Sequence, residues 1–389
     1  MNKYIEQQMT TFSTLLLKCA YFPLCSGCEI HGDVSVPPVW YQLKIFFQTA
    51  APDIPIPLNV KEIIGWRTRS KLAVRGTAAK PEIGLFKRGS HMVVPIPDCP
   101  LHHLSINTAY AHVREAIVKR KIDPYDEQRG AGFLRYLQFA VDRTSGKVQL
   151  VCVLNRPSSD ITPFVKQLYT EGGLHSVWTN VQPEQTNRIF GERWELCAGE
   201  PVLWEKVGSV ECAFHPACFA QAHPSLFDVA LQRIRAWVKP NSSILELYAG
   251  VGAIGLNLAE ACASCLCVEI NPFAEECFHL SRGRLPPEHR LKIAFQTASA
   301  ETSLPLLASK NVAIVDPPRK GLEKSVLDAL KYAKSLKQII YLSCGPRSFQ
   351  RDCEELMKGG WKIAHAEGFL FFPGCDHVEM LCCLEKGSG

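Results

Sequence analysis

Short apolar runs separated by stretches of helix length fill the chain from about residue 240 onward. The runs cover residues 244–248, 265–270, 291–297, 312–316 and 338–343, and a closing pair covers 361–369 and 378–385. Strands that are apolar along their whole length are buried on both faces, and their alternation with helices is typical of a parallel sheet. The pattern predicts a doubly wound, Rossmann-like α/β domain with seven strands.

The pattern before this region is that of an antiparallel α+β segment. Residues 134–142 and 147–155 are extended runs on either side of Arg143-Thr144-Ser145-Gly146, which indicates a β-hairpin. Further extended runs follow at 175–182 and 201–214. We therefore expect an antiparallel sheet ahead of the doubly wound domain.

The composition of the loops indicates where the chain divides. The first hundred residues are rich in proline and cysteine and end in the irregular stretch Pro95-Ile96-Pro97-Asp98-Cys99-Pro100. We expect a cysteine-rich, basic segment over 1–100, an α+β domain over 101–215 and the doubly wound domain over 216–389. A length of 389 residues agrees with this division, because it exceeds what one hydrophobic core usually organises.

The overall composition is that of a globular protein, with 47% hydrophobic and 21% charged residues. No apolar stretch is long enough to span a membrane and no secretory signal is readable, so we expect a cytoplasmic protein without a membrane partner. The net charge of +5 by itself implies no polyanionic partner. Without secretion, the 17 cysteines are expected to bind metal, to catalyse or to pack in a core.

A glycine-rich turn follows the first predicted strand of the doubly wound domain. Gly250, Gly252 and Gly255 let a ligand approach the backbone and the free amides at the start of a helix. Glu269 comes nineteen residues after Gly250, at the end of the next strand, where a carboxylate can accept both hydroxyls of a ribose. This spacing fits NAD and S-adenosylmethionine equally.

Two further strand ends carry reactive side chains. Asp316 begins the loop Asp316-Pro317-Pro318-Arg319-Lys320-Gly321, and Cys344 follows the next strand in Ser343-Cys344-Gly345-Pro346. Because the carboxyl ends of parallel strands meet at one crevice, we expect both groups beside the glycine turn. An enzyme that transfers a hydride needs no nucleophilic thiol there.

Other motifs accompany these strand ends, namely Phe219-x-Gln221, Phe372-Pro373, His377-Val378-Glu379 and three clustered cysteines near the start of the chain. In this order the motifs resemble those of the RNA 5-methyluridine methyltransferases, which act on uridine in tRNA or ribosomal RNA with S-adenosylmethionine. The resemblance covers most of the chain and implies an S-adenosylmethionine-dependent RNA (uracil-C5)-methyltransferase. It also implies a partner, structured RNA, and we infer no obligate protein partner.

The resemblance assigns roles to particular residues. Cys344 would be the nucleophile and Glu379 the general base, while Asp316 and Phe219 would contact the target nucleoside. The cofactor would be contacted by Gln221, Tyr248, Gly250, Glu269 and Asp316. The chain departs from the family's common asparagines at His223 and at Gly345.

These groups suit a covalent route, because carbon 5 of uracil is a poor nucleophile. Attack of the Cys344 thiolate on carbon 6 makes an enolate whose carbon 5 can take the methyl group. Glu379 would then remove the proton from carbon 5, and a partly desolvated pocket would raise its pKa toward the working range. Asp316 could bond the uracil edge and select it over cytosine.

Cys19, Cys25 and Cys28 lie in a loop containing glycine and proline, where three thiolates could converge. Cys99 lies in a similar irregular stretch, and the resemblance assigns these four cysteines to a [4Fe-4S] cluster. Zinc is the alternative, because four thiolates also suit a tetrahedral Zn²⁺ site. The remaining pairs Cys262/Cys265 and Cys382/Cys383 are expected in the core.

Basic residues alternate along a probable strand at 66–75, and Lys80, Lys87 and Arg88 follow. Such a face suits phosphate contacts with a folded RNA, whereas the plainer interpretation is a solvated strand face. Two other functions stay open from the residues alone. One is an NAD-linked oxidoreductase built on the same glycine turn, and the other is a catalytically inactive, metal-containing RNA-binding protein.

Overall fold

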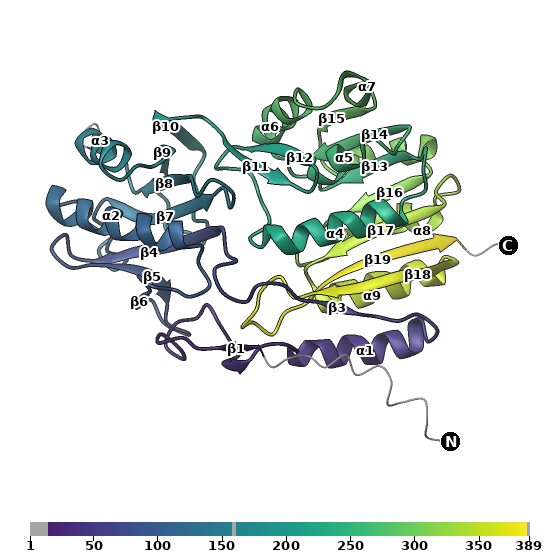
Figure 1. The fold of residues 1–389 in the computed structure, drawn as a ribbon, viewed down its shortest axis with the longest axis horizontal. Helices are drawn as coiled ribbons and strands as arrows, with labels where there is room; N and C mark the ends of the chain where they lie inside the picture. The colour runs from purple at the N-terminus through teal and green to yellow at the C-terminus, as the bar shows by residue number, and fades with distance from the viewer. Residues whose placement is uncertain (1–14, 158–160, 387–389) are drawn as a thin grey trace.

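Two large sheets organise the protein in the computed structural model, which describes residues 15–157 and 161–386 (Figure 1). In spatial order the strands of the larger sheet are β15 (Ile293–Thr297), β14 (Ser264–Glu269), β13 (Ser243–Leu247), β16 (Val312–Val315), β17 (Gln338–Ser343), β19 (Glu379–Lys386), β18 (Trp361–Phe369) and β3 (Leu58–Asn59). The first five strands run parallel to one another, and β19 is antiparallel to both of its neighbours, β17 and β18. All seven predicted strands are therefore confirmed, and β3 adds an eighth.

Helices cover both faces of this sheet, as a doubly wound fold requires. One face packs against α4 (Pro224–Trp237), α5 (Ala253–Leu258) and α6 (Pro272–Arg282) in a single apolar core. The other face packs against α1 (Pro38–Ala50), α8 (Lys324–Tyr332) and α9 (Pro346–Lys358) in a second core. The strand order reverses between β13 and β16, so the crevice at their carboxyl ends is where an open α/β sheet binds its ligands.

The second sheet lies in the other lobe and carries α2 (Leu104–Arg120) and α3 (Thr162–Thr170) (Figure 1). Its strands are, in order, β10 (Arg193–Gly199), β9 (Ser176–Val181), β8 (Val148–Leu154), β7 (Leu134–Val141), β4 (Arg69–Gly76), β5 (Pro81–Phe86) and β6 (Val93–Pro95). The predicted hairpin is confirmed as β7 and β8.

The prediction of a purely antiparallel sheet is wrong at one pair. Strand β9 runs parallel to β8, because α3 forms a crossover between them. Strand β10 was not predicted at all. Its residues are exposed or half-buried along its length, so it has no apolar run that would have shown it.

The first hundred residues are divided between the two sheets. Strand β4 pairs with β7, so the second sheet continues across the predicted boundary near residue 100, which lies between β6 and α2. Helix α1 instead packs on α9, with the rings of Phe47 and Phe349 6.1 Å apart, and β3 pairs with β18. The loop composition correctly indicates that no helix or strand crosses residue 100. It cannot indicate that β4 pairs with β7 on the other side of this loop, because strand pairing depends on residues far apart in the sequence.

Smaller elements complete the chain, namely β1 (Leu16–Leu17), β2 (Gly32–Asp33), the hairpin β11 (Leu203–Val207) and β12 (Val210–Phe214), α7 (Pro287–Arg290) and a 3₁₀ helix over Glu301–Ser309. Among the described residues, no helix is both long and apolar enough to cross a membrane.

Candidate active site and cysteine cavity

The glycine turn after β13 adopts the left-handed backbone that glycine favours. Gly250 and Gly252 have φ angles of 54° and 76°, and Tyr248 has a φ of 61°, which is uncommon for a residue with a side chain. A Cβ atom added at Gly250 would meet no atom within 4 Å. The backbone of this turn therefore borders open space, as a ligand-binding turn must.

Gly255 is needed for packing rather than for ligand access. A Cβ atom there would lie 2.6 Å from Cys267 Sγ and 2.7 Å from a carboxylate oxygen of Glu246. Glu246, Cys265 and Cys267 bring their ligand atoms within 4.8 Å of one another. The Glu246 carboxylate accepts hydrogen bonds from Gly255 N at 2.8 Å and from the Cys267 thiol at 3.2 Å, so internal donors already satisfy this buried acid.

Glu269 is fixed at the end of β14 by two backbone amides. Its carboxylate accepts hydrogen bonds from Gly250 N at 3.0 Å and from Asn271 N at 2.9 Å. The neighbouring Ile270 is 68% exposed, although it is a large apolar side chain. The acid and the apolar side chain together suit the ribose and the base of a nucleoside, and the sequence pattern had indicated only the acid.

The eight residues predicted to catalyse the reaction or to bind substrate or cofactor all line one cavity. This cavity lies at the carboxyl ends of the parallel strands, and we call it the strand-end cavity. The eight residues are Phe219, Gln221, Tyr248, Gly250, Glu269, Asp316, Cys344 and Glu379. The cavity has a volume of about 640 Å³, which lies within the roughly 300–1,000 Å³ of a pocket for a small ligand.

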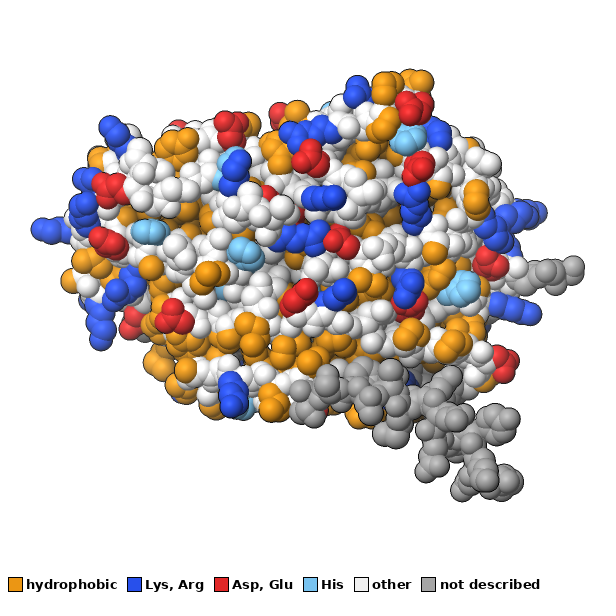
Figure 2. All heavy atoms as spheres, viewed as in Figure 1, with side chains coloured by type: hydrophobic (Ala, Val, Ile, Leu, Met, Phe, Trp, Pro, Cys, Tyr) orange, Lys and Arg blue, Asp and Glu red, His pale blue; other side chains and the backbone are white. Residues whose placement is uncertain are grey.

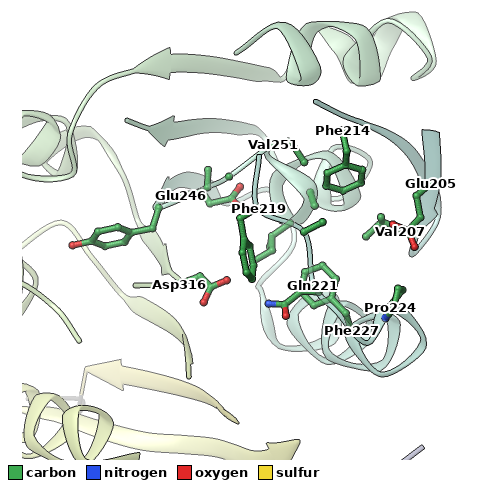
Figure 3. A pocket seen from close by; sticks show the side chains of 16 residues that line it. Glu205, Val207, Phe214, Phe219, Gln221, Pro224, Phe227, Glu246, Val251 and Asp316 are labelled. Atoms are coloured by element: carbon green, nitrogen blue, oxygen red, sulfur yellow. The ribbon is translucent and has the colours of Figure 1, made fainter. Parts of the chain in front are cut away.

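A narrower recess extends from this cavity between β11, β12 and α4 (Figure 3). The side chains of Phe219, Gln221 and Asp316 gather at one end of the recess, and apolar side chains such as Phe214 and Val207 line the other end (Figure 3). Phe219 is 67% exposed, so its ring is available to a ligand rather than packed in the core.

Three strand ends bring Cys344, Asp316 and Glu379 together. Cys344 follows β17, with its Sγ 3.9 Å from Pro317 O in the loop after β16. Glu379 is the first residue of β19, which pairs with β17. His377 Nε2 lies 2.5 Å from Cys344 O, so this histidine ties the loop before Glu379 to the backbone of Cys344.

Burial controls the protonation of all three groups. It raises the pKa of Glu379 to about 8, although the nearby Arg319 guanidinium opposes the shift. Burial, followed by the charges of Glu379 and Asp316, raises the pKa of the Cys344 thiol to about 11. Burial and the neighbouring carboxylates of Glu379 and Glu246 raise the pKa of Asp316 well above its usual value. Arg319 is a cation of this cavity that the sequence reasoning had not assigned.

The two departures from the family pattern have local explanations. A Cβ atom at Gly345 would lie 2.4 Å from Arg319 O, so a side chain here would push the Asp316–Gly321 loop away from Cys344. His223 is fully buried and faces the N-terminal segment instead of the strand-end cavity. Its Nε2 lies 3.0 Å from Glu62 O and its ring stacks on Trp66 at 5.1 Å.

The four predicted metal-binding cysteines line a second cavity, which we call the cysteine cavity. Cys19, Cys25 and Cys28 come from the loop between β1 and β2, and Cys99 comes from the loop between β6 and α2. Burial, together with the charges of the neighbouring cysteines, raises the pKa of Cys28 to about 12. Among the described residues, no three of these thiols lie within 4.8 Å of one another. The pairs Cys262/Cys265 and Cys382/Cys383 are buried, as expected.

The predicted basic strand is confirmed as β4, but its face is not a free basic surface. Arg69 is paired with the buried Glu205, and Arg75 is paired with Glu127. Lys71 remains exposed, with its Nζ 4.7 Å from the centre of the Phe190 ring. Figure 2 shows Lys and Arg side chains spread among Asp and Glu over one face of the molecule. The pairing partners lie far away in the sequence, so the alternation of charges could not reveal them.

Comparison with known proteins identifies the class. The model of the tRNA (uracil-5-)-methyltransferase family matches residues 304–387. An RNA methyltransferase of Protochlamydia amoebophila is 42% identical over 379 residues, which cover 95% of this chain and 98% of the relative. An RNA methyltransferase of Lactobacillus johnsonii is 29% identical and is matched over 73% of its length. The chain therefore belongs to this family of RNA methyltransferases.

A solved structure agrees with the predicted fold. The Pyrococcus abyssi tRNA (uracil-54, C5)-methyltransferase in complex with S-adenosyl-L-homocysteine superimposes with a TM-score of 0.73 at 24% identity. The match covers 93% of this chain and 86% of that chain. The Rossmann-like fold of an S-adenosylmethionine-dependent methyltransferase is thus confirmed.

Proposed function

We propose that the protein methylates carbon 5 of a uridine in structured RNA, either ribosomal RNA or tRNA, with S-adenosylmethionine as the methyl donor. The observation that carries this proposal is the strand-end cavity, where a thiol and two carboxyl groups face the same space as the glycine turn. The family supports RNA as the substrate class. Ribosomal RNA and tRNA are present in the cytoplasm, where we expect the enzyme to act.

The cavity offers two adjoining binding regions. Glu269 and Gly250 are placed for the nucleoside part of the cofactor, and Gln221 and Tyr248 for the rest of it. When bound, S-adenosylmethionine supplies an electrophilic methyl group on a sulfonium. The exposed ring of Phe219 is placed to stack on the target base, which must leave its helical stack to reach Cys344.

In the proposed reaction, the Cys344 thiolate adds to carbon 6 of uracil, and the π electrons of the double bond between carbons 5 and 6 move onto carbon 5 and the carbonyl oxygen at position 4 as an enolate. Carbon 5 then takes the methyl group, and the sulfonium becomes a neutral thioether. Glu379 removes the proton from carbon 5, after which the bond from carbon 6 to sulfur breaks and the thiolate leaves. One proton is released overall and no electrons are consumed.

The two carboxyl groups fit these roles as they stand in the free protein, whereas the Cys344 thiol, with a pKa of about 11, must first lose its proton to attack as a thiolate. A pKa of about 8 makes Glu379 a base matched to neutral pH. Burial and the neighbouring carboxylates favour the protonated form of Asp316, and a protonated carboxyl group can donate to the carbonyl at position 4 of uracil and accept from the N–H at position 3.

The cysteine cavity fits a bound [4Fe-4S] cluster, and zinc is the alternative. Burial raises the pKa values of three of these thiols, those of Cys25, Cys28 and Cys99, so a cation is needed to stabilise their thiolates, and binding a metal would release their protons. The resemblance to the RNA 5-methyluridine methyltransferases favours the iron–sulfur cluster, although four thiolates also suit tetrahedral Zn²⁺.

The test is transfer of a labelled methyl group from S-adenosylmethionine to RNA, followed by mapping of 5-methyluridine in RNA from cells with and without the protein. We expect label in RNA and the loss of at least one 5-methyluridine without the protein. Label at another atom or another base would contradict the proposal, and no transfer to any RNA would favour the inactive RNA-binding protein. Thermal protection by NADH but not by S-adenosylhomocysteine would favour the oxidoreductase.

A further inference from the structure

The loop that leads into Glu379 is held from outside by the loop that carries the first cysteines. We call residues 25–30 the cysteine loop and residues 370–378 the base loop. Gly374 O accepts hydrogen bonds from Glu29 N at 2.6 Å and from Ile30 N at 2.8 Å. The Glu29 carboxylate in turn accepts one from Asp376 N at 3.0 Å. Two segments from opposite ends of the chain are thus joined by three hydrogen bonds.

Close packing also restricts movement of the base loop against the cysteine loop. Gly374 has a φ of 91°, and a Cβ atom there would lie 3.2 Å from Cys28 Sγ. Cys375 Sγ lies 3.4 Å from Gly27 O, so a fifth thiol also touches the cysteine loop. The Asp376 carboxylate accepts a hydrogen bond from Val39 N at 2.7 Å, at the start of α1. The base loop is therefore fixed by the cysteine loop on one side and by α1 on another.

The inner side of the base loop reaches the two reacting groups. His377 Nε2 lies 2.5 Å from Cys344 O, and Glu379 follows two residues later as the first residue of β19. A shift of the base loop would therefore change the positions of the thiol and of the carboxylate together. Misplacement of reacting groups by about 1 Å can lower a rate about a hundredfold.

We propose that the cysteine loop positions the reacting groups through the base loop, with Glu29 as the positioning residue. This inference rests on the proposed function, because it concerns where Cys344 and Glu379 stand in that reaction. It gives the cysteine loop a role in the chemical step, in addition to any part in metal or RNA binding. Displacement of the cysteine loop then lowers kcat even when cofactor and RNA are bound.

The test compares Glu29→Ala with Glu29→Gln in the full-length, metal-loaded protein, with Glu288→Ala on α7 as a matched control. In an RNA containing 5-fluorouridine, fluorine stands in place of the proton on carbon 5, so the methylated adduct is not released. The rate of adduct formation therefore reports the position of Cys344, and kcat on uridine RNA reports the positions of both Cys344 and Glu379. We expect Glu29→Ala to lower this rate and kcat about tenfold to a hundredfold. The KM for RNA, the Kd for S-adenosylhomocysteine and the metal content should stay within about twofold of wild type.

Glu29→Gln keeps an oxygen that can accept from Asp376 N, so it should restore the rate to within a few-fold of wild type. Hydrogen exchange of the base loop amides should rise in Glu29→Ala alone. An adduct that forms equally fast in wild type and Glu29→Ala would overturn the positioning role, as would parallel losses of rate, melting temperature and cofactor binding. If wild type forms no adduct while Glu29→Ala still loosens the base loop, the positioning contact stands and the proposed function fails.

Discussion

The strand-end cavity and the cysteine cavity hold their functional side chains on different kinds of backbone. Asp316, Cys344 and Glu379 stand at the ends of β16, β17 and β19, whose residues are buried in the two cores of the large sheet. The four cysteines stand on loops and are half-buried. The first cavity is therefore shaped by cores that fold without a ligand, whereas the second gains order from whatever its thiols bind.

The electrostatics of the two cavities are alike in kind. In the strand-end cavity, Arg319 offsets part of the burial that raises the pKa of Glu379. In the cysteine cavity, Arg67 offsets part of the burial that raises the pKa values of Cys25 and Cys99, while neighbouring thiols raise the pKa of Cys28 further. The comparison teaches that the proposed cofactor site and the proposed metal site depend on separate cores of the fold, so substitutions can separate the binding of the two ligands.

The largest expected effect is that of Cys344→Ala. The thiol activates uracil but does not hold the cofactor, so methyl transfer should fall at least about 10⁴-fold while the Kd for S-adenosylhomocysteine changes less than about twofold. Radiolabel transfer and calorimetry measure the two quantities. Cys197→Ala, at an exposed cysteine of β10, is the control and should behave like wild type. Turnover near wild type in Cys344→Ala would remove the thiol from the mechanism.

Glu379→Gln should act at a later step. Without the base, the methylated adduct cannot lose its proton, so turnover should fall about 10²- to 10⁴-fold and a protein–RNA adduct should survive denaturing electrophoresis. Glu385→Gln, on the same strand and paired with Lys239 at the surface, controls for the loss of a carboxylate. Absence of any adduct on an RNA that wild type methylates would show that Glu379 is not the base.

The strand-end cavity could be largely predicted from the sequence, because apolar runs show where strands end and Gly250, Glu269, Asp316 and Cys344 follow such runs directly. Their assembly in one cavity follows from parallel strands sharing an edge. Their individual roles stay predictions, which the variants described here test.

What the sequence could not reveal are contacts between distant segments. The pairing of β4 with β7, the ion pair of Arg69 with Glu205 and the contact of Cys375 with the cysteine loop all join residues with no local signal. A run of alternating charges looks the same whether its arginines meet water or a buried carboxylate. Only the packing of one lobe on the other decides between them.

The cysteine cavity should respond to loss of its ligand set, while cofactor binding in the strand-end cavity should not. Anaerobically purified protein should be brown with about four irons per chain, and Cys99→Ser should lower the iron content and the hydrogen-exchange protection of residues 15–33 and 69–101. The Kd for S-adenosylhomocysteine should change less than about threefold, because the large sheet has its own cores. Cys197→Ser is the matched control. Stoichiometric zinc, or iron loading that Cys99→Ser leaves unchanged, would contradict the four-ligand iron–sulfur assignment.

The smallest effect is expected at His223, which lies between the N-terminal segment and α4. Burial, assisted by the charge of Arg143, lowers its pKa from 6.5 to about 4, so the unfolded chain binds more protons than the folded protein between these values. The free energy of unfolding should therefore rise with pH from about 4 to 6.5, and His223 alone should contribute about 2 kcal/mol of loss between pH 7 and pH 5. His223→Asn keeps a donor for Glu62 O and cannot titrate, so urea unfolding of this variant should show a shallower slope over that window. Equal slopes in both proteins would mean that His223 is protonated at little cost, and that its site between the N-terminal segment and α4 is open to water.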